Sequence, residues 1–524
     1  MQSFTSVKML LYDELKNLIS LRGFVTLALC YVFVKAIYGL FFHQLSSIPG
    51  PRIAALTSWY EFWWNCPKKG RYMFKIEEMH QQYGPIVRIN PWEVHINDPT
   101  YWDVLYSNNK LEKDPWYYRA FGSDGATVCT VSPELHRIRR GAMANFFSRA
   151  NVAKLEPRVL SRVQQLCSRL EEHKDRGKAV DISNAFRCLA TDIVTDYAAP
   201  RTRDFLSTPD FAAAFNRVLR DFSGLMHWHR HIPVVFTIMT SIPRGFIEWM
   251  DPTGANVAII DNQADLLFQA RAVVEQVPRT KETPTVLNEI YDSPTLSPSD
   301  KSLKRIFDET QAVLGAGTET TGNTLSVLTY YVLANPSILQ NLRSELESAA
   351  IASETGPNIL LTSRILEPLP YLQATIKEAL RVSSSVSGRL PRRSPVSTMT
   401  YTSPAGQRYD LPPGTVVSMS MRDMHFNPSI FPNPYCFDPN RWIHATPTEL
   451  ERMEKAFVPF GRGVRGCIGL ELAKQELLLV TGNMFWKFDM RLYATTEKDV
   501  GVEHDYFSPF GPGNSKGVRI NVIS

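Results

Sequence analysis

The sequence is poor in several features that define particular classes of protein. Its seven cysteines are widely spaced and include no C-x-x-C pair, which argues against a disulfide scaffold and a zinc site and favours a reducing compartment. The formal net charge is only +5, and no lysine- or arginine-rich run is present, so nucleic acid is not an expected partner. The chain also shows no internal repeat and no flexible linker. We therefore expect one large domain.

An apolar segment lies near the N-terminus. Residues 23–42 are apolar except for Lys35, and about 20 such residues cross a bilayer core. No small-residue cleavage site follows, which favours a retained transmembrane anchor over a signal peptide. A buried helix of the main domain is the alternative. We expect an N-terminal segment at 1–22, the anchor at 23–42, a proline-rich, non-helical hinge at 43–52 and the main domain at 53–524.

The rest of the chain predicts a mostly α domain of α+β type with small sheets. Residues 86–90 and 94–97 alternate as a hairpin would. From about residue 132 to 381 the apolar spacing is helical, with a break at Asn335-Pro336. Residues 389–442 are rich in proline and glycine, with a short strand at 415–419. A last helix is expected after Cys467, to about Phe485.

The strongest motif is the segment 460–469, with the pattern F-x-x-G-x-R-x-C-x-G. Cys467 precedes a helix, whose N-terminus would lower the thiol pKa and stabilise a thiolate. Gly463 allows a tight turn and a close approach to a flat cofactor. Arg465 is placed to pair with an anionic group of that cofactor, and Phe460 could shield the sulfur. A buried cysteine in a glycine-rich turn is the alternative.

A second motif lies within the long apolar helix that is expected at residues 303–334. Ala316 and Gly317 are small, and they precede Glu319 and Thr320. Small residues would let a helix cross a flat cofactor closely, the threonine hydroxyl could bind dioxygen or water, and the acid could deliver protons. Packing of two helices through small residues is the alternative.

Two further pairs share helix faces. His136 and Arg140 are spaced i,i+4, and Glu378 and Arg381 are spaced i,i+3. Arg441 supplies a second arginine, so that a buried Glu–Arg–Arg network can form. We expect this network to hold the cysteine loop in register.

Taken together, the segment 460–469 resembles the haem-binding signature of the cytochrome P-450 family, and residues 316–320 match the family's [AG]-G-x-[DE]-T pattern. The resemblance implies the cytochrome P-450 fold, with haem b (iron protoporphyrin IX) between the helix of Thr320 and the loop of Cys467. It implies Cys467 as the iron ligand and an oxygen-activating role for Glu319 and Thr320. Haem contacts are implied for these residues: Phe460, Gly463, Arg465, His136, Arg140 and Arg392.

The resemblance also implies a partner and a location. Electrons would come from NADPH through NADPH–cytochrome P-450 reductase, and the anchor would lie in the lipid of the endoplasmic reticulum membrane as a single pass, with the catalytic domain in the cytosol. The reaction would hydroxylate or epoxidise a hydrophobic small molecule. A haem-thiolate isomerase or dehydratase, and a non-enzymatic haem-binding sensor, are the alternatives.

A narrower resemblance concerns the substrate. Residues 89–96, 386–392 and 463–469 are similar to fungal members of the trichodiene-oxygenase type, which act on terpenoids and polyketides in secondary metabolism. Ser384 departs from the proline that many members have there. Candidate substrate contacts are Ala312, Ala316, Val386 and Phe121. Finally, Arg137, Arg139 and Arg462 could form a basic patch for an acidic electron donor.

Overall fold

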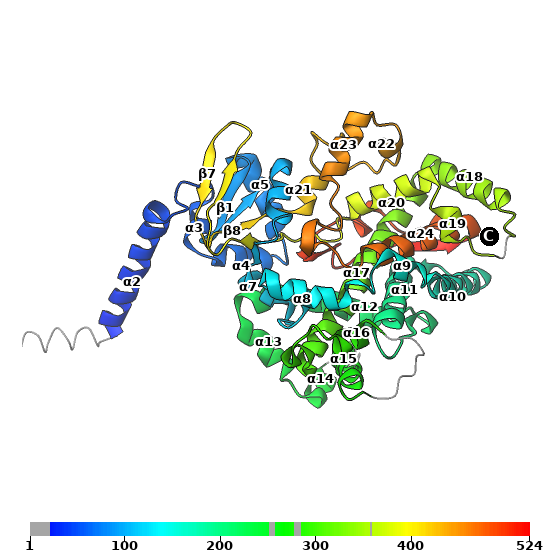
Figure 1. Cartoon of the computed structure of the whole chain (residues 1–524), viewed down its shortest axis with the longest axis horizontal. Helices are drawn as coiled ribbons and strands as arrows, with labels where there is room; N and C mark the ends of the chain where they lie inside the picture. The colour runs from blue at the N-terminus through cyan, green and yellow to red at the C-terminus, as the bar shows by residue number, and fades with distance from the viewer. Residues whose placement is uncertain (1–20, 251–256, 277–284, 357–358, 524) are drawn as a thin grey trace, which may run out of the picture.

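The computed structural model describes residues 21–250, 257–276, 285–356 and 359–523. Figure 1 shows a mostly helical body with small sheets at its margins and one helix that projects from it. The predicted fold class is therefore confirmed. The helices are α2 (Leu21–Ile37), α3 (Arg52–Leu56), α4 (Trp59–Asn65), α5 (Tyr72–Tyr83), α6 (Trp102–Tyr106), α7 (Pro115–Tyr118), α8 (Pro133–Ala144), α9 (Arg149–Ala153), α10 (Glu156–Asp175), α11 (Ile182–Ala198), α12 (Ala213–His231), α13 (Pro233–Thr240), α14 (Arg244–Met250), α15 (Val257–Val274), α16 (Val286–Asp292), α17 (Leu303–Ala334), α18 (Pro336–Ala352), α19 (Ser363–Leu366), α20 (Pro370–Ser383), α21 (Met421–His425), α22 (Asn440–Ile443), α23 (Pro447–Ala456) and α24 (Leu470–Lys487).

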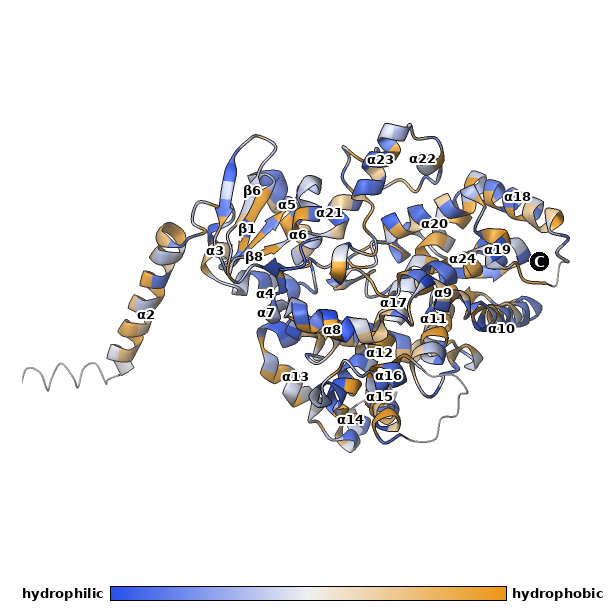
Figure 2. Cartoon of the chain, viewed as in Figure 1, coloured by the Kyte–Doolittle hydropathy of each residue, from blue (hydrophilic) through white to orange (hydrophobic). Residues whose placement is uncertain are grey.

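The projecting helix is the predicted anchor. Helix α2 continues as a π-helical turn, Tyr38–Phe42, and the apolar stretch Gly23–Phe42 has 20 residues, a mean hydropathy of 2.0 and almost no buried surface apart from Gly39. By length and composition it is a candidate membrane span, visible as the orange helix apart from the body in Figure 2. Its end is tied to the domain, because Arg88 donates to the carbonyl of Gly39 at 2.9 Å.

The largest sheet has five strands in the order β1-β2-β8-β5-β3. The predicted hairpin forms its edge as β1 (Ile86–Asn90) and β2 (Glu93–Ile96), and the predicted strand at 415–419 is β8 (Val416–Ser418), parallel to β2. Strand β5 (Arg392–Arg393) pairs with β3 (Glu112–Lys113), which places Lys113 opposite Arg392. The smaller sheets contain β4 (Val180–Asp181), β12 (Arg519–Val522) and β9 (Met490–Leu492); β6 (Met399–Thr402) and β7 (Arg408–Leu411); and β10 (His504–Tyr506) and β11 (Ser508–Phe510).

The long helix α17 is the axis of the main core. It packs against α11, α15, α20 and α24, and its bounds are those predicted from the sequence. It ends at Ala334 because Pro336 disfavours a helical Asn335, lacks a backbone donor and begins α18. The last predicted helix is α24, two residues longer than expected. The short helices α21, α22 and α23, within the proline-rich region, were not predicted.

Candidate functional site

The loop around Cys467 is held by backbone hydrogen bonds and by one irreplaceable glycine. The N–H of Cys467 donates to the carbonyl of Phe460 at 2.7 Å, which turns the chain back just before α24 begins. Gly463 has a φ of +67°, and a Cβ there would lie 2.5 Å from the carbonyl oxygen of Tyr106. Only glycine can therefore occupy this position. The close approach that we expected for Gly463 is made to the end of α6.

The thiol of Cys467 does not have the lowered pKa that its place before a helix predicted. Solvent reaches its side chain on one side, yet burial by the surrounding protein raises its pKa. The N–H of Gly469 and the charge of Arg140 act in the opposite direction without outweighing burial. A further positive partner such as a metal ion would favour the thiolate.

Five basic side chains gather beside this loop, and we call them the basic cluster. They come from β3, α8, β5 and the loop itself, and they are Lys113, His136, Arg140, Arg392 and Arg465. Arg140 donates to the carbonyl of Gly466 at 2.8 Å, which joins the cluster to the cysteine loop. Arg392 donates to the hydroxyl of Tyr118 at 3.1 Å, and Arg465 donates to main-chain carbonyls in the loop before α8.

The basic cluster forms no ion pair among the described residues. No basic nitrogen of the cluster lies within 4.0 Å of a carboxylate oxygen of a described residue, which is the distance that defines an ion pair. The Nε of Arg465 is buried without a hydrogen-bond partner. Burial, reinforced by the other cluster members, lowers the pKa of His136 to about 3 and that of Arg465 to about 10. The same causes hold the pKa of Lys113 well below its usual range.

This donor set fits an anionic group with several oxygens. Buried cations are costly without an anion, and guanidinium groups bind carboxylates in pairs of hydrogen bonds. The two propionates of haem would supply that charge beside the cysteine. No group of three or more metal-ligating side chains occurs in the described parts of the chain, so iron here would have to bring most of its own ligands.

Helix α17 has two exposed small residues near its middle. They are Gly315 and Ala316, not the expected pair of Ala316 and Gly317. Gly317 instead faces α11, where a Cβ would lie 2.8 Å from the side chain of Val194. Close helix packing therefore explains Gly317, and the open face of the helix is shifted toward its N-terminus.

Glu319 and Thr320 lie on the same helix but have different partners. Glu319 forms two hydrogen bonds with Arg187 of α11, at 2.7 and 2.8 Å. The hydroxyl of Thr320 donates to the carbonyl of Ala316 at 2.8 Å, and its own carbonyl accepts from Ser385 at 3.4 Å. Thr320 thus lies near the segment that follows α20, whereas the carboxylate of Glu319 is held on α11.

The predicted Glu–Arg–Arg network is closed. The fully buried carboxylate of Glu378 accepts from Arg381 at 2.7 and 3.0 Å and from Arg441 at 3.0 Å. Trp442 donates its indole N–H to the same carboxylate at 2.9 Å. Arg381 also donates to the carbonyl of His425 at 2.9 Å.

The candidate substrate contacts are partly joined by aromatic packing. Phe121 stacks on Tyr118, and its ring lies edge-on to Phe507 at 4.8 Å between centroids. Phe507 was not among the predicted substrate contacts. It occupies the tip of the β10–β11 hairpin with a φ of +71°, which is rare for a bulky residue. Val386 is partly buried against the second hydrophobic core, and Ala312 is partly buried on α17.

Two members of the predicted basic patch form ion pairs with aspartates of the same chain, one largely buried and one partly exposed. Arg139 binds Asp300 at 2.7 Å, and Arg462 binds Asp103 at 3.1 Å. Their charges are therefore partly compensated, and a docking patch made by these three arginines stays a prediction.

Sequence reasoning missed two residues of the site, Lys113 and Arg187. Neither stands in a motif, and each reaches the site only through tertiary pairing, Lys113 through β3 and Arg187 through the contact of α11 with α17. No signal in the sequence separates them from ordinary surface cations.

Comparisons with known proteins agree with this geometry. The family model of cytochrome P-450 matches residues 55–513. Among curated relatives, the cytochrome P-450 monooxygenase sdnE of Sordaria araneosa is 35% identical over 96% of this chain and 98% of its own length. The tryptophan 6-hydroxylase fscE of Fusarium equiseti is 34% identical, over 97% and 98% respectively. The conidiogenone synthase PchP450 of Penicillium rubens is 34% identical, over 93% and 96%. With most of the chain covered by the family model and these relatives matched over nearly their full length, the chain belongs to the cytochrome P-450 family of haem-dependent monooxygenases.

Proposed function

We propose that Cys467 is the axial ligand of haem b, that the basic cluster holds the propionates, and that the enzyme oxidises a hydrophobic small molecule. The observation that carries this proposal is the basic cluster beside the cysteine loop, in which Lys113, His136 and Arg392 are buried and no member forms an ion pair with a carboxylate of the described residues. Within it, Arg465, His136, Arg140 and Arg392 are the propionate contacts, and Gly463 and Phe460 shape the loop behind the sulfur.

The chemistry that a thiolate-bound haem supplies is reductive activation of dioxygen. Overall, R–H, O2, two electrons and two protons give R–OH and H2O. The chain's own contribution is to hold the cofactor, exclude water and deliver protons. Thr320 is placed to donate a hydrogen bond toward the haem side once its bond to Ala316 is released. Glu319 can pass a proton only when its carboxylate leaves Arg187.

The substrate is proposed to be a terpenoid or polyketide of fungal secondary metabolism. Its supports are the small or apolar side chains of Ala312, Ala316, Val386 and Phe121, which suit a hydrophobic ligand, and the three sequence segments similar to the trichodiene-oxygenase type. Relatives of similar identity are named as a conidiogenone synthase and as a tryptophan 6-hydroxylase, so the named activities differ within the group.

We further propose that electrons come from NADPH through NADPH–cytochrome P-450 reductase, and that the protein is a single-pass protein of the endoplasmic reticulum membrane with its catalytic domain in the cytosol. The apolar span Gly23–Phe42 supports a lipid anchor. A second exposed apolar surface supports contact of the domain with lipid. It lies on α13 and α14 and consists of Val234, Ile238, Phe246 and Trp249.

The test is oxygen incorporation by the full-length protein in microsomes, with reductase, NADPH, isotopically labelled dioxygen and a panel of terpenoids and polyketides. A product that carries one labelled oxygen atom and depends on NADPH is the expected result. Product formed without NADPH, or without the label, would indicate an isomerase or dehydratase instead. Haem binding without any NADPH-dependent turnover across the panel would indicate a sensor.

A further inference from the structure

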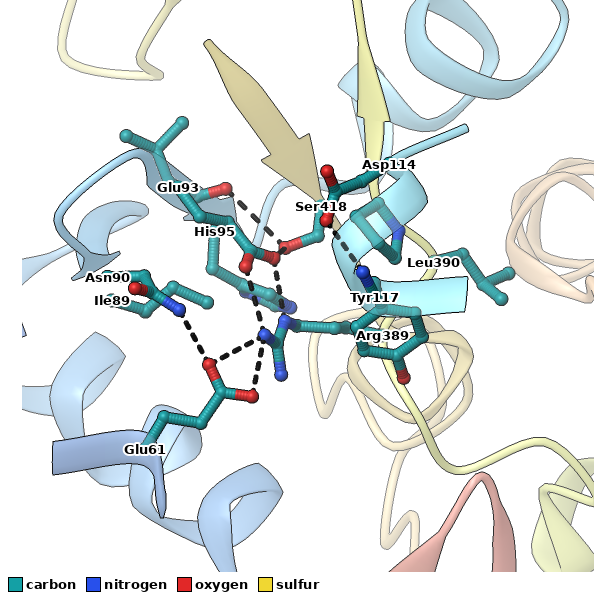
Figure 3. A network of polar contacts seen from close by, with 12 residues as sticks. Glu61, Ile89, Asn90, Glu93, His95, Asp114, Tyr117, Arg389, Leu390 and Ser418 are labelled. Atoms are coloured by element: carbon teal, nitrogen blue, oxygen red, sulfur yellow. Dashed lines mark hydrogen bonds and ion pairs between the residues drawn. The ribbon is translucent and has the colours of Figure 1, made fainter. Parts of the chain in front are cut away.

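A buried ion-pair network lies away from the cysteine loop and has no role in the function proposed so far (Figure 3). Arg389 is its centre. Its Nε and Nη2 donate to the two carboxylate oxygens of Glu93 at 2.6 and 2.9 Å, and Nη2 also lies 2.9 Å from both oxygens of Glu61. Both carboxylates are fully buried, and the side chain of Arg389 is only 6% exposed.

The network joins elements that are far apart in the chain. Glu61 lies on α4, shortly after the anchor, and Glu93 lies on β2. Glu61 also binds Arg230 at the C-terminal end of α12, at 3.2 Å, and Ser418 of β8 donates to Glu93 at 2.7 Å. Arg389 belongs to none of these elements, since it lies in the irregular segment between α20 and β5.

The charges in the network are balanced, but unevenly shared. Two guanidinium groups face two carboxylates. Burial opposes the ionised form of Glu61, yet Arg389, His231 and Arg230 lower its pKa to about 2. Glu93 has Arg389 as its only cationic partner among the described residues, and burial keeps the pKa of Glu93 above its usual value. Glu93 is therefore the carboxylate whose charge can be removed at the lower cost.

The segment around Arg389 leads directly to the basic cluster. The N–H groups of Ser387 and Gly388 donate to the carbonyl of Phe507 at 2.9 and 3.2 Å, at the tip of the β10–β11 hairpin. The carbonyl of Leu390 accepts a hydrogen bond from the hydroxyl of Tyr106 at 2.9 Å. Tyr106 is the last residue of α6, and its own carbonyl oxygen is the atom that leaves room only for glycine at position 463. Two residues later Arg392 enters the basic cluster.

We propose that Arg389 is a positioning residue, which fixes residues 386–392 on the scaffold and thereby holds Arg392 in place for a haem propionate. This inference rests on the proposed haem site. The physical reason is geometric. A planar guanidinium bound to two fixed carboxylates cannot shift or rotate without breaking several short hydrogen bonds, so the main chain that carries it is fixed as well. Arg392 itself is held by a neutral hydroxyl and its neighbour's carbonyl, which are weaker restraints.

The alternative is that Arg389 only neutralises two buried carboxylates. Substitution of Arg389 alone cannot separate the two possibilities, because it leaves an excess of buried negative charge and destabilises the fold. The double variant Arg389→Gln/Glu93→Gln does separate them. It leaves Glu61 paired with Arg230, so the network is again neutral, but the bidentate attachment of the segment is lost.

The experiment compares the full-length wild-type holoenzyme with this double variant. Three quantities are measured: the denaturant midpoint of unfolding, the rate of haem transfer to apomyoglobin, and the carbon monoxide difference spectrum of the reduced protein. We expect an unfolding midpoint close to that of wild type, an unchanged thiolate spectrum and haem loss that is faster by roughly 10-fold or more. Arg389→Lys, which keeps the charge without the fork, should also lose haem faster.

The control is another ion pair of low exposure, Arg203 with Asp265 at 2.7 Å, in which Asp265 also binds the exposed Arg201. Arg203→Gln/Asp265→Asn should lose haem at the wild-type rate. Haem loss at the wild-type rate in the Arg389 double variant would overturn the proposal. The proposal would also be overturned if Arg203→Gln, at an equal loss of stability, lost haem as fast as the Arg389 double variant. A general loss of stability would then explain the faster haem loss. A wild-type protein without the thiolate spectrum would instead contradict the haem site itself.

Discussion

At the scale of single residues, Lys113 shows what the site requires most clearly. Its side chain is 5% exposed, donates to the carbonyl of Val128 and lies 4.2 Å from the ring centroid of Tyr118. A carbonyl and an aromatic ring do not offset the charge of a buried ammonium group. The lysine is therefore unfavourable in the protein alone and becomes favourable when an anion arrives.

Lys113→Met is expected to have opposite effects on the two forms of the protein. The apoprotein should become more stable, because a buried charge is replaced by an apolar group of similar length. The affinity for haem should fall about 10-fold, because one propionate contact is lost. Unfolding of the apoprotein and haem transfer to apomyoglobin measure the two effects. Lys110→Met, at an exposed position, is the control. Equal changes of the same sign in both assays would refute this account of Lys113.

Glu319 and Thr320 are expected to act on protons rather than on binding. Glu319→Gln and Thr320→Val should each lower the rate of product formation by about 100-fold while haem content stays unchanged. NADPH should still be consumed, with less product formed per NADPH. Thr318→Val is the control on the same helix, because its hydroxyl faces Thr191 of α11 at 3.0 Å. Product yields that fall equally in the control would show that packing, not proton delivery, is disturbed.

The residues that could be predicted are those whose motif fixes their environment. Cys467, Arg465, Glu378 and Arg381 follow from short spacings along the chain. Lys113 and Arg389 do not, because strand pairing and ion pairs across the fold bring them into place. Ser384 is intermediate. Its departure from proline was visible, but its φ of +41°, which proline cannot adopt, was not.

At the scale of elements, the segments that flank the cysteine loop hold it from behind. Arg381 binds the carbonyls of His425, Pro434 and Cys436, and Glu378 binds the N–H of Asp438 at 3.0 Å. His425 in turn accepts the N–H of Val458 at 3.0 Å, two residues before Phe460. The network thus reaches the loop through α21 and the chain that follows it.

Glu378→Gln is expected to destabilise the holoprotein by about 3–5 kcal/mol, because two buried guanidinium groups lose the one carboxylate that they bind among the described residues. Chemical unfolding measures the change. Glu454→Gln is the control, since Glu454 pairs with Lys377 at the surface and such pairs contribute at most about 1 kcal/mol. Similar costs in the two variants would show that the buried network is not what holds this region.

His425 should make this region sensitive to acid. Burial, with the charge of Arg381, lowers its pKa from 6.5 to about 3, and its Nε2 must remain unprotonated to accept from Val458. Between these values the unfolded chain binds a proton that the folded chain does not. Stability is therefore lost as the pH falls below about 6.5, by about 2 kcal/mol at about pH 5.

His425→Gln keeps an acceptor and removes this titration. When the pH is lowered from about 7 to about 5, the difference in unfolding free energy between variant and wild type should change by about 2 kcal/mol in favour of the variant. Denaturant unfolding at the two pH values checks this result, with His444→Gln at an exposed position as the control. A difference between variant and wild type that does not change with pH would contradict the assignment of a neutral, buried imidazole.

Elements were more predictable than the faces they present. The bounds of α17 followed from its apolar spacing and from Pro336, but the packing of Gly317 on Val194 could not be foreseen, because a small residue is equally suited to a cofactor and to another helix. The short helices α21, α22 and α23 have too few turns to show a period.

At the scale of the whole molecule, the apolar N-terminal helix and the main domain form a connected unit. Arg88 of β1 binds the carbonyl of Gly39 at the end of the apolar helix, and Glu61 on α4 joins the same N-terminal region to Arg389. The order of motifs along the chain was enough to predict the fold class, since these motifs occur together in one family. The couplings between distant segments required the structure.

The central claim is that the sulfur of Cys467 binds the haem iron. The carbon monoxide difference spectrum of the reduced, full-length protein tests it most directly. We predict the strongly red-shifted band of thiolate-bound ferrous haem in wild type and in Cys436→Ala, which removes another exposed cysteine, and its absence in Cys467→Ala. A wild-type protein without that band, or a Cys467→Ala variant that keeps it, would contradict the account.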